Sequence, residues 1–190
     1  MIINKLSEKI NSLYPLSSNA FKLFVSCAQQ NELSKGQSLL SEGQICNHLY
    51  FVESGHLRTY MSKDGNEINL NFTFDGNFLS NIKSLKTNQP SEYNIKAGEK
   101  SLVTLFDKSI LLDLYSISKE IELLCRKILG YMVIESDEHL EFHKLQTPKE
   151  RYLFLLKYEP QMVQRVPVSQ LSSYLGVARE TLSRIRKSIY

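Results

Sequence analysis

The sequence has few cysteines, and their placement narrows the classes of protein to consider. Only three occur among 190 residues, Cys27, Cys46 and Cys125. Their odd number and wide spacing are unsuited to a disulfide framework or to a CxxC-type metal site. We interpret them as buried, reduced thiols.

Long apolar runs are also missing. The first residues lack the apolar stretch of a secretory signal peptide, and no window approaches the roughly 18 consecutive apolar residues of a membrane span. We therefore expect a cytoplasmic protein that does not contact a membrane.

Familiar catalytic motifs are absent as well. The chain contains no Gly-x-Ser-x-Gly elbow, no P-loop and no dinucleotide fingerprint. His48, Glu53 and His56 form an incomplete cupin-like metal set, and His139 and His143 have a zinc-chelating spacing that also suits a polar helix end. We expect no enzyme activity, no metal and no cofactor.

Basic charge is concentrated at the C-terminal end. Residues 1–108 contain 11 basic and 10 acidic side chains, residues 109–145 contain 4 and 7, and residues 146–190 contain 8 and 3. Such an excess favours a polyanionic partner through counterion release. A solvated charged tail is the alternative from composition alone.

The stretch from Glu32 to Phe106 has the pattern of antiparallel strands. Short apolar runs are separated by glycines, Asp64-Gly65 is a hairpin signal, and apolar residues alternate from Ile68 to Phe74. We predict a β-sandwich or barrel here, preceded by helical spacing that runs from Ile2 to Gln30 and is interrupted at Pro15.

From Ser118 to Phe142 the spacing becomes helical. The region has no proline and a single glycine, which predicts a helix about 37 Å long. One apolar stripe would face the β domain and another a second subunit. The alternative, one wide face buried within a single chain, stays open. The residues predicted for the dimer contact are Ile121, Leu124, Ile128 and Tyr131.

The last part of the chain predicts a small helical unit. Thr147, Pro148 and Glu150 form a capping box, and Pro160 ends the helix that follows. Two short helices flank Gly176, in the layout of a helix-turn-helix. We expect the second helix to read duplex DNA bases with Arg179, Glu180, Ser183 and Arg184, while phosphates are contacted by Ser169, Thr181, Arg186 and Lys187.

The chain resembles the Crp/Fnr family of bacterial transcription regulators. "KGQSLLSEGQICNHLYFVESGHLRTY", residues 35–60, is similar to the opening of the family's cyclic-nucleotide-binding β-roll, and "LGVARETLSRIR" is similar to its recognition helix. The resemblance implies an α+β protein: an N-terminal antiparallel β-roll or jelly roll (1–116), a long dimerisation helix (117–145) and a winged helix-turn-helix domain (146–190). It also implies a homodimer on a two-fold-symmetric site, with RNA polymerase as a further candidate partner.

Departures from the family pattern concern the ligand. Ser80-Asn81 stands where nucleotide-binding members have Gly-Glu, and "NQPSEYNIK", residues 88–96, contains no arginine. A buried cyclic phosphate needs a cationic partner, for which Lys83, Lys86 and Lys96 are the candidates. We expect weak or no cyclic AMP binding and an unidentified small-molecule effector, if any. The candidate pocket residues are Gly76, Ser80, Asn81 and Ser91.

Other departures leave alternatives open. The oxygen-sensing members' four-cysteine cluster has no counterpart in the three cysteines. Ala178 occupies the N-cap position of the recognition helix, where relatives have serine or threonine, and the chain ends at Tyr190, where the family's winged domain usually continues. From Ala178 we expect a recognition helix that is less firmly started. From the short end we expect either weaker DNA binding or a native chain that differs slightly at its end. A sensor or interaction module whose basic end binds protein is the other reading.

Overall fold

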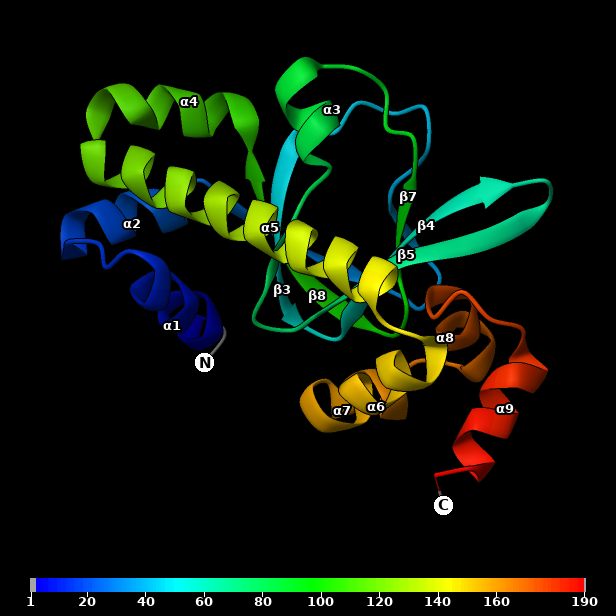
Figure 1. Cartoon of the computed structure of the whole chain (residues 1–190). Helices are drawn as coiled ribbons and strands as arrows, with labels where there is room; N and C mark the ends of the chain where they lie inside the picture. Colours follow the sequence, from blue (N-terminus) through cyan, green and yellow to red (C-terminus); the bar gives the residue numbers. More distant parts are fainter. Residues whose placement is uncertain (1–2, 190) are drawn as a thin grey trace.

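The computed structural model describes residues 3–189, which form a β domain, one long helix and a cluster of short helices (Figure 1). The N-terminal segment forms α1 (Ile3–Leu13) and α2 (Ser18–Ser26), separated around Pro15 as predicted. The helical prediction extends too far, however. Ala28–Gln30 belong to strand β1 (Ala28–Leu33), because they pair with Thr104–Phe106 of β8 at the edge of a sheet.

Two four-stranded sheets make up the β domain and confirm the predicted antiparallel roll. One has the order β1-β8-β3-β6 and the other β2-β7-β4-β5. Every pairing is antiparallel. The remaining strands are β2 (Ser38–Leu40), β3 (His48–Ser54), β4 (His56–Lys63), β5 (Asn66–Phe74), β6 (Phe78–Leu79), β7 (Asn94–Ala97) and β8 (Ser101–Asp107), with the short helix α3 (Ile82–Thr87) between β6 and β7.

The β4–β5 hairpin confirms the Asp64-Gly65 turn but corrects the alternation along β5. Both turn residues have positive φ, 52° and 77°, as a two-residue hairpin of this kind requires. A register shift follows between Thr59 and Tyr60 of β4. Beyond this bulge the two faces of β5 exchange, so Ile68 is exposed and Asn69 is buried, the reverse of the predicted pattern.

Helix α4 (Lys108–Ile117) leads into the long helix α5 (Lys119–Leu145), which confirms the predicted helix. The dimer stripe placed on α5 is wrong for three of its four residues. Ile121, Leu124 and Ile128 are fully buried against α1, α2, α4 and the sheet of β3 and β8, and Tyr131 is half-buried. The most regular apolar stripe of α5 therefore packs into the core of its own chain.

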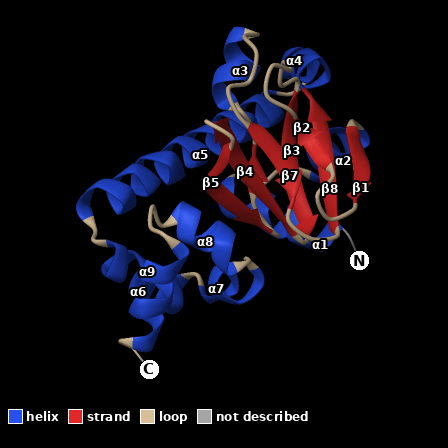
Figure 2. Ribbon diagram, turned by 90° about the vertical axis from the view of Figure 1, so that its right-hand side faces the viewer, coloured by secondary structure: helices blue, strands red, loops and turns tan. Residues whose placement is uncertain are grey.

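The C-terminal part contains four helices, α6 (Pro148–Tyr158), α7 (Pro160–Arg165), α8 (Val168–Tyr174) and α9 (Arg179–Lys187). The Thr147–Glu150 capping box is present. The described residues 146–189 are connected by turns and contain no strand, so no wing is seen among them. These helices share a core with Phe72 and Phe74, so the unit packs on β5 (Figure 2).

None of the helices within residues 3–189 combines the length and apolarity that a membrane crossing requires.

Candidate functional site

Helices α8 and α9 form the predicted helix-turn-helix. Gly176 adopts a φ of 69° in the turn, a backbone conformation that favours glycine, and Leu182 of α9 is fully buried in the core of the unit. The four residues predicted to read bases are all exposed, on the sides of α9 away from Leu182: Arg179, Glu180, Ser183 and Arg184. The sequence therefore identified an outward polar row correctly.

The residues predicted for phosphate contact divide into two groups. Ser169, Thr181 and Lys187 are exposed. Arg186 is half-buried: its guanidinium carbon lies 5.5 Å from the centroid of the Tyr152 ring, and its Nε is buried with no hydrogen-bond partner among the described residues. The side chain thus lies against Tyr152 of α6, and its predicted phosphate contact stays a prediction.

The start of α9 is weakly capped. Ala178 has the extended backbone of an N-cap residue, φ −67° and ψ 152°, but has no side chain that could accept a hydrogen bond from the first turn. This confirms the sequence expectation. The missing cap leaves the end that carries Arg179 and Glu180 less firmly held.

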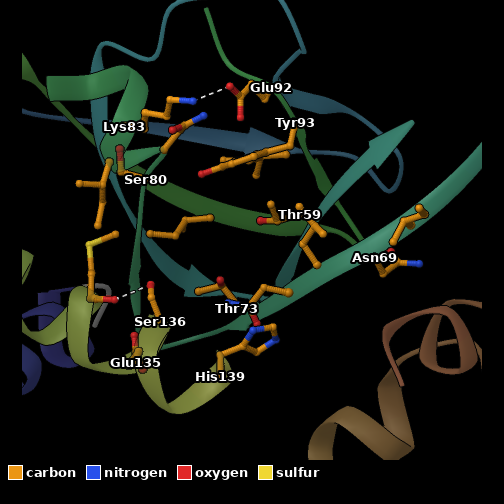
Figure 3. A pocket seen from close by; sticks show the side chains of 18 of the residues that line it. Thr59, Asn69, Thr73, Ser80, Lys83, Glu92, Tyr93, Glu135, Ser136 and His139 are labelled. Atoms are coloured by element: carbon orange, nitrogen blue, oxygen red, sulfur yellow. Dashed lines mark hydrogen bonds and ion pairs between the residues drawn. The ribbon is translucent and has the colours of Figure 1, made fainter. Parts of the chain in front are cut away.

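A cavity of about 670 Å³ lies between the β domain, α5 and α8 (Figure 3). Of the four predicted pocket residues, Ser80 and Asn81 line it and Gly76 and Ser91 do not. Gly76 lies in the β5–β6 turn, where its N–H donates to the Val52 carbonyl. Ser91 is inside the β domain, where its Oγ accepts from Asn81 Nδ2 at 2.8 Å and donates to the Tyr93 carbonyl.

The cavity contains little net positive charge. No arginine is among its described lining residues, and the one lysine, Lys83, pairs with Glu92 at 2.5 Å. Lys96 lies over the Tyr60 ring instead, and Lys86 is also outside the lining. The cationic partner that a cyclic phosphate needs is therefore not found in the described wall.

Helix α5 contributes two histidines and a carboxylate to the wall. His139 and His143 have ring centroids 4.5 Å apart, and burial lowers the pKa of both, that of His143 to about 4. Burial raises the pKa of Glu135, whose Oε1 accepts a hydrogen bond from the Tyr131 hydroxyl at 2.6 Å. Within residues 3–189 no third metal-ligating side chain joins the two histidines, so they do not make a zinc site by themselves.

The cupin-like candidates do not converge either. Each has its own partner: His48 faces Asp107 at 3.7 Å, Glu53 accepts from Thr104 at 2.7 Å, and His56 faces Glu99 at 3.4 Å. Their side chains are used within the fold of the β domain.

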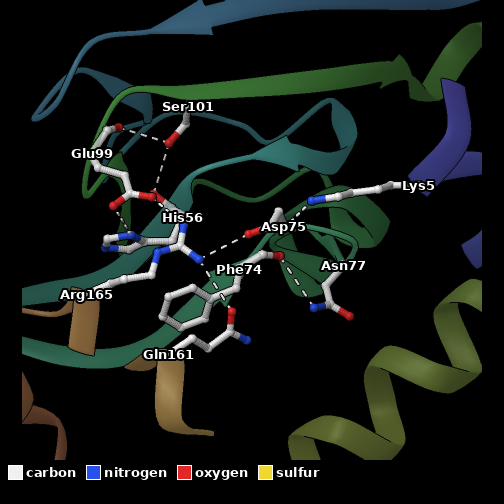
Figure 4. A network of polar contacts seen from close by, with 9 residues as sticks. All are labelled: Lys5, His56, Phe74, Asp75, Asn77, Glu99, Ser101, Gln161 and Arg165. Carbon is white, nitrogen blue, oxygen red and sulfur yellow. Dashed lines mark hydrogen bonds and ion pairs between the residues drawn. The ribbon is translucent and has the colours of Figure 1, made fainter. Parts of the chain in front are cut away.

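A polar network that sequence reasoning missed joins the C-terminal unit to the β domain (Figure 4). Arg165 of α7 pairs with Glu99 and with Asp75, the latter at 3.1 Å, and its guanidinium lies 4.9 Å from the Phe74 ring centroid. Lys5 of α1 also pairs with Asp75. The four charged side chains, Lys5, Asp75, Glu99 and Arg165, are 24 to 160 residues apart in the sequence, so no local pattern could have connected them.

Comparisons with known proteins agree with this architecture. A family model of the cyclic nucleotide-binding domain matches residues 30–118, and no curated protein sequence matches the chain. FixK2 from Bradyrhizobium japonicum is 21% identical, with 85% of this chain and 84% of that chain covered and a TM-score of 0.70.

Two further solved structures are similar over most of the chain. The c-di-GMP responsive global regulator CLP of Xanthomonas campestris is 18% identical, with 91% of each chain covered and a TM-score of 0.70. The catabolite activator protein of Thermus thermophilus is 19% identical, with 92% of this chain and 84% of that chain covered and a TM-score of 0.56. At these identities the likeness establishes the fold. Residues 30–118 therefore match the cyclic nucleotide-binding domain family, within a chain whose fold is that of the solved Crp/Fnr regulators.

Proposed function

We propose that this chain is a homodimeric transcription regulator that binds a two-fold-symmetric DNA site with α9. The observation that carries the proposal is the polar row of Arg179, Glu180, Ser183 and Arg184, which is exposed while Leu182 on the same helix is buried. Arginine can bond bidentately to guanine, and glutamate can accept from the cytosine amino group. The 8 basic and 3 acidic residues of 146–190 supply attraction to the phosphates.

The proposed dimer uses a different face of α5 from the one predicted. Val133, Ile134 and Leu140 are 56%, 59% and 48% exposed, and Gly130 has open space at its Cβ position. Together they form the exposed apolar face of α5. A second copy packed along this face would bury it and would pair two recognition helices about 34 Å apart, one turn of DNA.

Regulation by an effector is part of the proposal. The cavity adjoins both α5 and the helix-turn-helix, so an occupant with different affinities for two placements of α9 would shift the population between them. The lack of an arginine in the described wall supports an effector other than cyclic AMP.

The test is selection of bound duplexes from a random DNA pool by the purified chain at two salt concentrations. The expected result is enrichment of a palindromic motif whose half-sites are one helical turn apart. Retention that weakens with salt but enriches no motif, with and without lysate small molecules, would contradict the proposal.

A further inference from the structure

A buried histidine lies beneath the contact between α7 and the β domain. His56 is the first residue of β4, is fully buried, and lies opposite Phe74 in the β4–β5 pairing. Its ring centroid is 5.1 Å from that of Phe74, and the guanidinium carbon of Arg165 lies 4.9 Å from the same Phe74 centroid (Figure 4). The histidine of the β domain and the arginine of α7 therefore share one aromatic surface.

The turn between β7 and β8 is fixed to this histidine. The His56 carbonyl accepts hydrogen bonds from the Gly98 N–H at 3.0 Å and from the Ser101 hydroxyl at 3.2 Å. A Cβ on Gly98 would lie 2.0 Å from His56 Nε2, so the turn can approach the ring this closely only with glycine there. Glu99, the next residue, is thereby held between the His56 ring and Arg165.

The Glu99 carboxylate is shared between these two side chains. Its Oε1 accepts a hydrogen bond from Arg165 Nη2, and its Oε2 lies 3.4 Å from His56 Nδ1. The second contact does not have hydrogen-bond geometry, and neither ring nitrogen of His56 has a hydrogen-bond partner within residues 3–189. A neutral imidazole has one N–H to satisfy, whereas a protonated imidazole has two and carries a charge. The docked structure therefore holds the neutral ring at a lower cost than the charged ring.

The charges around the ring also disfavour a proton on it. Among the described residues, charged groups face His56 from three elements: Glu99 in the β7–β8 turn, Arg165 in α7 and Lys35 in the turn between β1 and β2. Two cations and one carboxylate thus surround the ring, so a proton on His56 adds to an excess of positive charge.

Protonation of His56 and docking of α7 are therefore coupled. Burial lowers the pKa of His56 below its ordinary value of 6.5, Glu99 raises it, and Arg165 lowers it again. By linkage, an effect of Arg165 on the His56 proton is an equal effect of that proton on the placement of Arg165. When α7 moves away, the ring loses the guanidinium and keeps Glu99, so it binds the proton more tightly. Docking consequently weakens as pH falls below 6.5 towards the lowered pKa.

We propose that His56, Glu99 and Arg165 form a proton-sensitive latch, in which uptake of one proton by His56 loosens the hold of the β domain on α7 and through it on the helix-turn-helix. His56 is a positioning residue that acts through Glu99. The inference goes beyond the proposed function, because it makes the placement of α9 depend on pH whatever α9 binds.

The proton itself is followed by NMR titration of the His56 ring from about pH 8 to about pH 5, a range in which histidine titrates. The spectrum of His56→Gln identifies the signal. We expect the His56 midpoint to lie at higher pH in Arg165→Gln than in wild type, because the neighbouring guanidinium has been removed. An unchanged midpoint would overturn the coupling between His56 and Arg165.

The hold on the C-terminal unit is measured by amide hydrogen exchange. Between about pH 7.5 and about pH 5.5, protection factors of the α7 and α8 amides in wild type should fall about threefold to tenfold, since a pKa that differs by one between docked and released states corresponds to a factor of ten. Arg165→Gln should be weakly protected at both pH values. His56→Gln, which cannot take up the proton, should show no such fall. The matched control is His48→Gln, which removes a histidine that faces Asp107 and should keep the wild-type response.

The comparison isolates the latch from other titrating groups. The lowered pKa values of Asp75 and Glu99 keep both carboxylates charged over this range, and any contribution of His143 is the same in wild type and Arg165→Gln. An equal fall in these two proteins, or a fall that persists in His56→Gln, would overturn the proposal. If His56→Gln does not fold, wild type and Arg165→Gln decide the question alone. None of these measurements uses DNA, so a failure here is distinguishable from a failure of the DNA selection experiment.

Discussion

Arg165 Nη1 lies 3.1 Å from Asp75 Oδ1, and this pair connects α7 of the C-terminal unit to the turn that follows β5. Glu99, in the turn between β7 and β8, contacts the same guanidinium. One side chain of the C-terminal unit is thus held by two loops of the β domain. Ser173 of α8 makes a second connection, because its hydroxyl donates to the Glu67 carbonyl of β5. Together, the two connections fix where the proposed recognition helix lies.

Removing this connection should loosen the C-terminal unit. Arg165→Gln leaves two part-buried carboxylates without their guanidinium, and we expect a loss of about 1 kcal/mol in urea unfolding, because the pair is partly solvent-screened. Exchange of α8 amides should also accelerate. Lys119→Gln, which removes an exposed lysine from Glu122 but leaves that carboxylate paired with Arg126, is the matched control and should change the stability by less than about 0.5 kcal/mol. Equal effects of the two variants would contradict the assigned role of Arg165.

The same connection should weaken in acid. Burial tends to raise the pKa of Asp75 and Glu99, but hydrogen bonds from Arg165, and from Lys5 to Asp75, outweigh it and lower both pKa values. Their stabilisation is therefore complete above their ordinary values of 3.8 and 4.5 and is lost as pH falls through the lowered ones. The stability difference between wild type and Arg165→Gln should shrink below pH 4.5. A constant difference down to pH 3 would rule this out.

His143 should make the fold sensitive to mildly acidic pH. Burial first, then the neighbouring His139 and Arg151, lowers its pKa from 6.5 to about 4. The unfolded chain therefore takes up a proton at higher pH than the folded chain, and stability is lost as pH falls from 6.5 towards 4. Relative to His143→Phe, wild type should lose about 1–2 kcal/mol over this range, measured by urea unfolding at stepped pH. Parallel curves for the two proteins would contradict the prediction.

A capping residue should strengthen α9. Ala178 already has N-cap backbone angles, so Ala178→Ser can accept a hydrogen bond from the first turn without rearrangement. We expect a gain of about 1 kcal/mol in stability and slower exchange at the α9 amides. Ala178→Gly, which adds no acceptor, is the control. If Ala178→Ser stabilises the protein no more than Ala178→Gly does, the start of α9 is already held by other contacts.

Charge on the exposed apolar face of α5 should prevent the proposed dimer. Val133→Glu with Ile134→Glu puts two carboxylates where apolar side chains would be buried, at a cost of about 1.5–3 kcal/mol for each side chain in each subunit. Sedimentation should show a monomer with an unchanged circular dichroism spectrum. Ile45→Glu, at an exposed apolar residue in the β2–β3 loop, should remain dimeric. If the double variant still dimerises, the contact lies elsewhere.

Base-reading and phosphate-contacting side chains should differ in their effects on DNA binding. Arg179→Ala or Arg184→Ala should relax specificity by about 1–3 kcal/mol at individual base pairs, whereas Lys187→Ala should weaken binding evenly and lower the salt slope by about 1. Arg186→Ala should mainly reduce stability, because its guanidinium stacks on Tyr152. Titrations of the selected site and single-mismatch sites at several salt concentrations measure both quantities. Equal, sequence-independent losses from all four variants would contradict these assignments.

Local chemistry was enough to predict the elements and the polar face of α9. The Asp64-Gly65 turn, the Thr147 capping box, the uncapped Ala178 and the exposed Arg179 and Arg184 follow from backbone preferences and helical spacing within a few residues. Each of these features depends only on residues close to it in the chain, so it can be predicted from the sequence alone.

Tertiary structure decided which faces are covered and which polar groups meet. The stripe of Ile121, Leu124 and Ile128 suits a dimer contact as well as it suits an internal core, and only the packing of α1, α4 and the sheet shows that the chain covers it itself. The cavity wall of His143, Asn69 and Tyr174 likewise brings α5, β5 and α8 together, across more than 100 residues of sequence. Helical and strand periodicity specifies that a face is apolar, whereas the partner of that face depends on how distant segments share a limited buried volume.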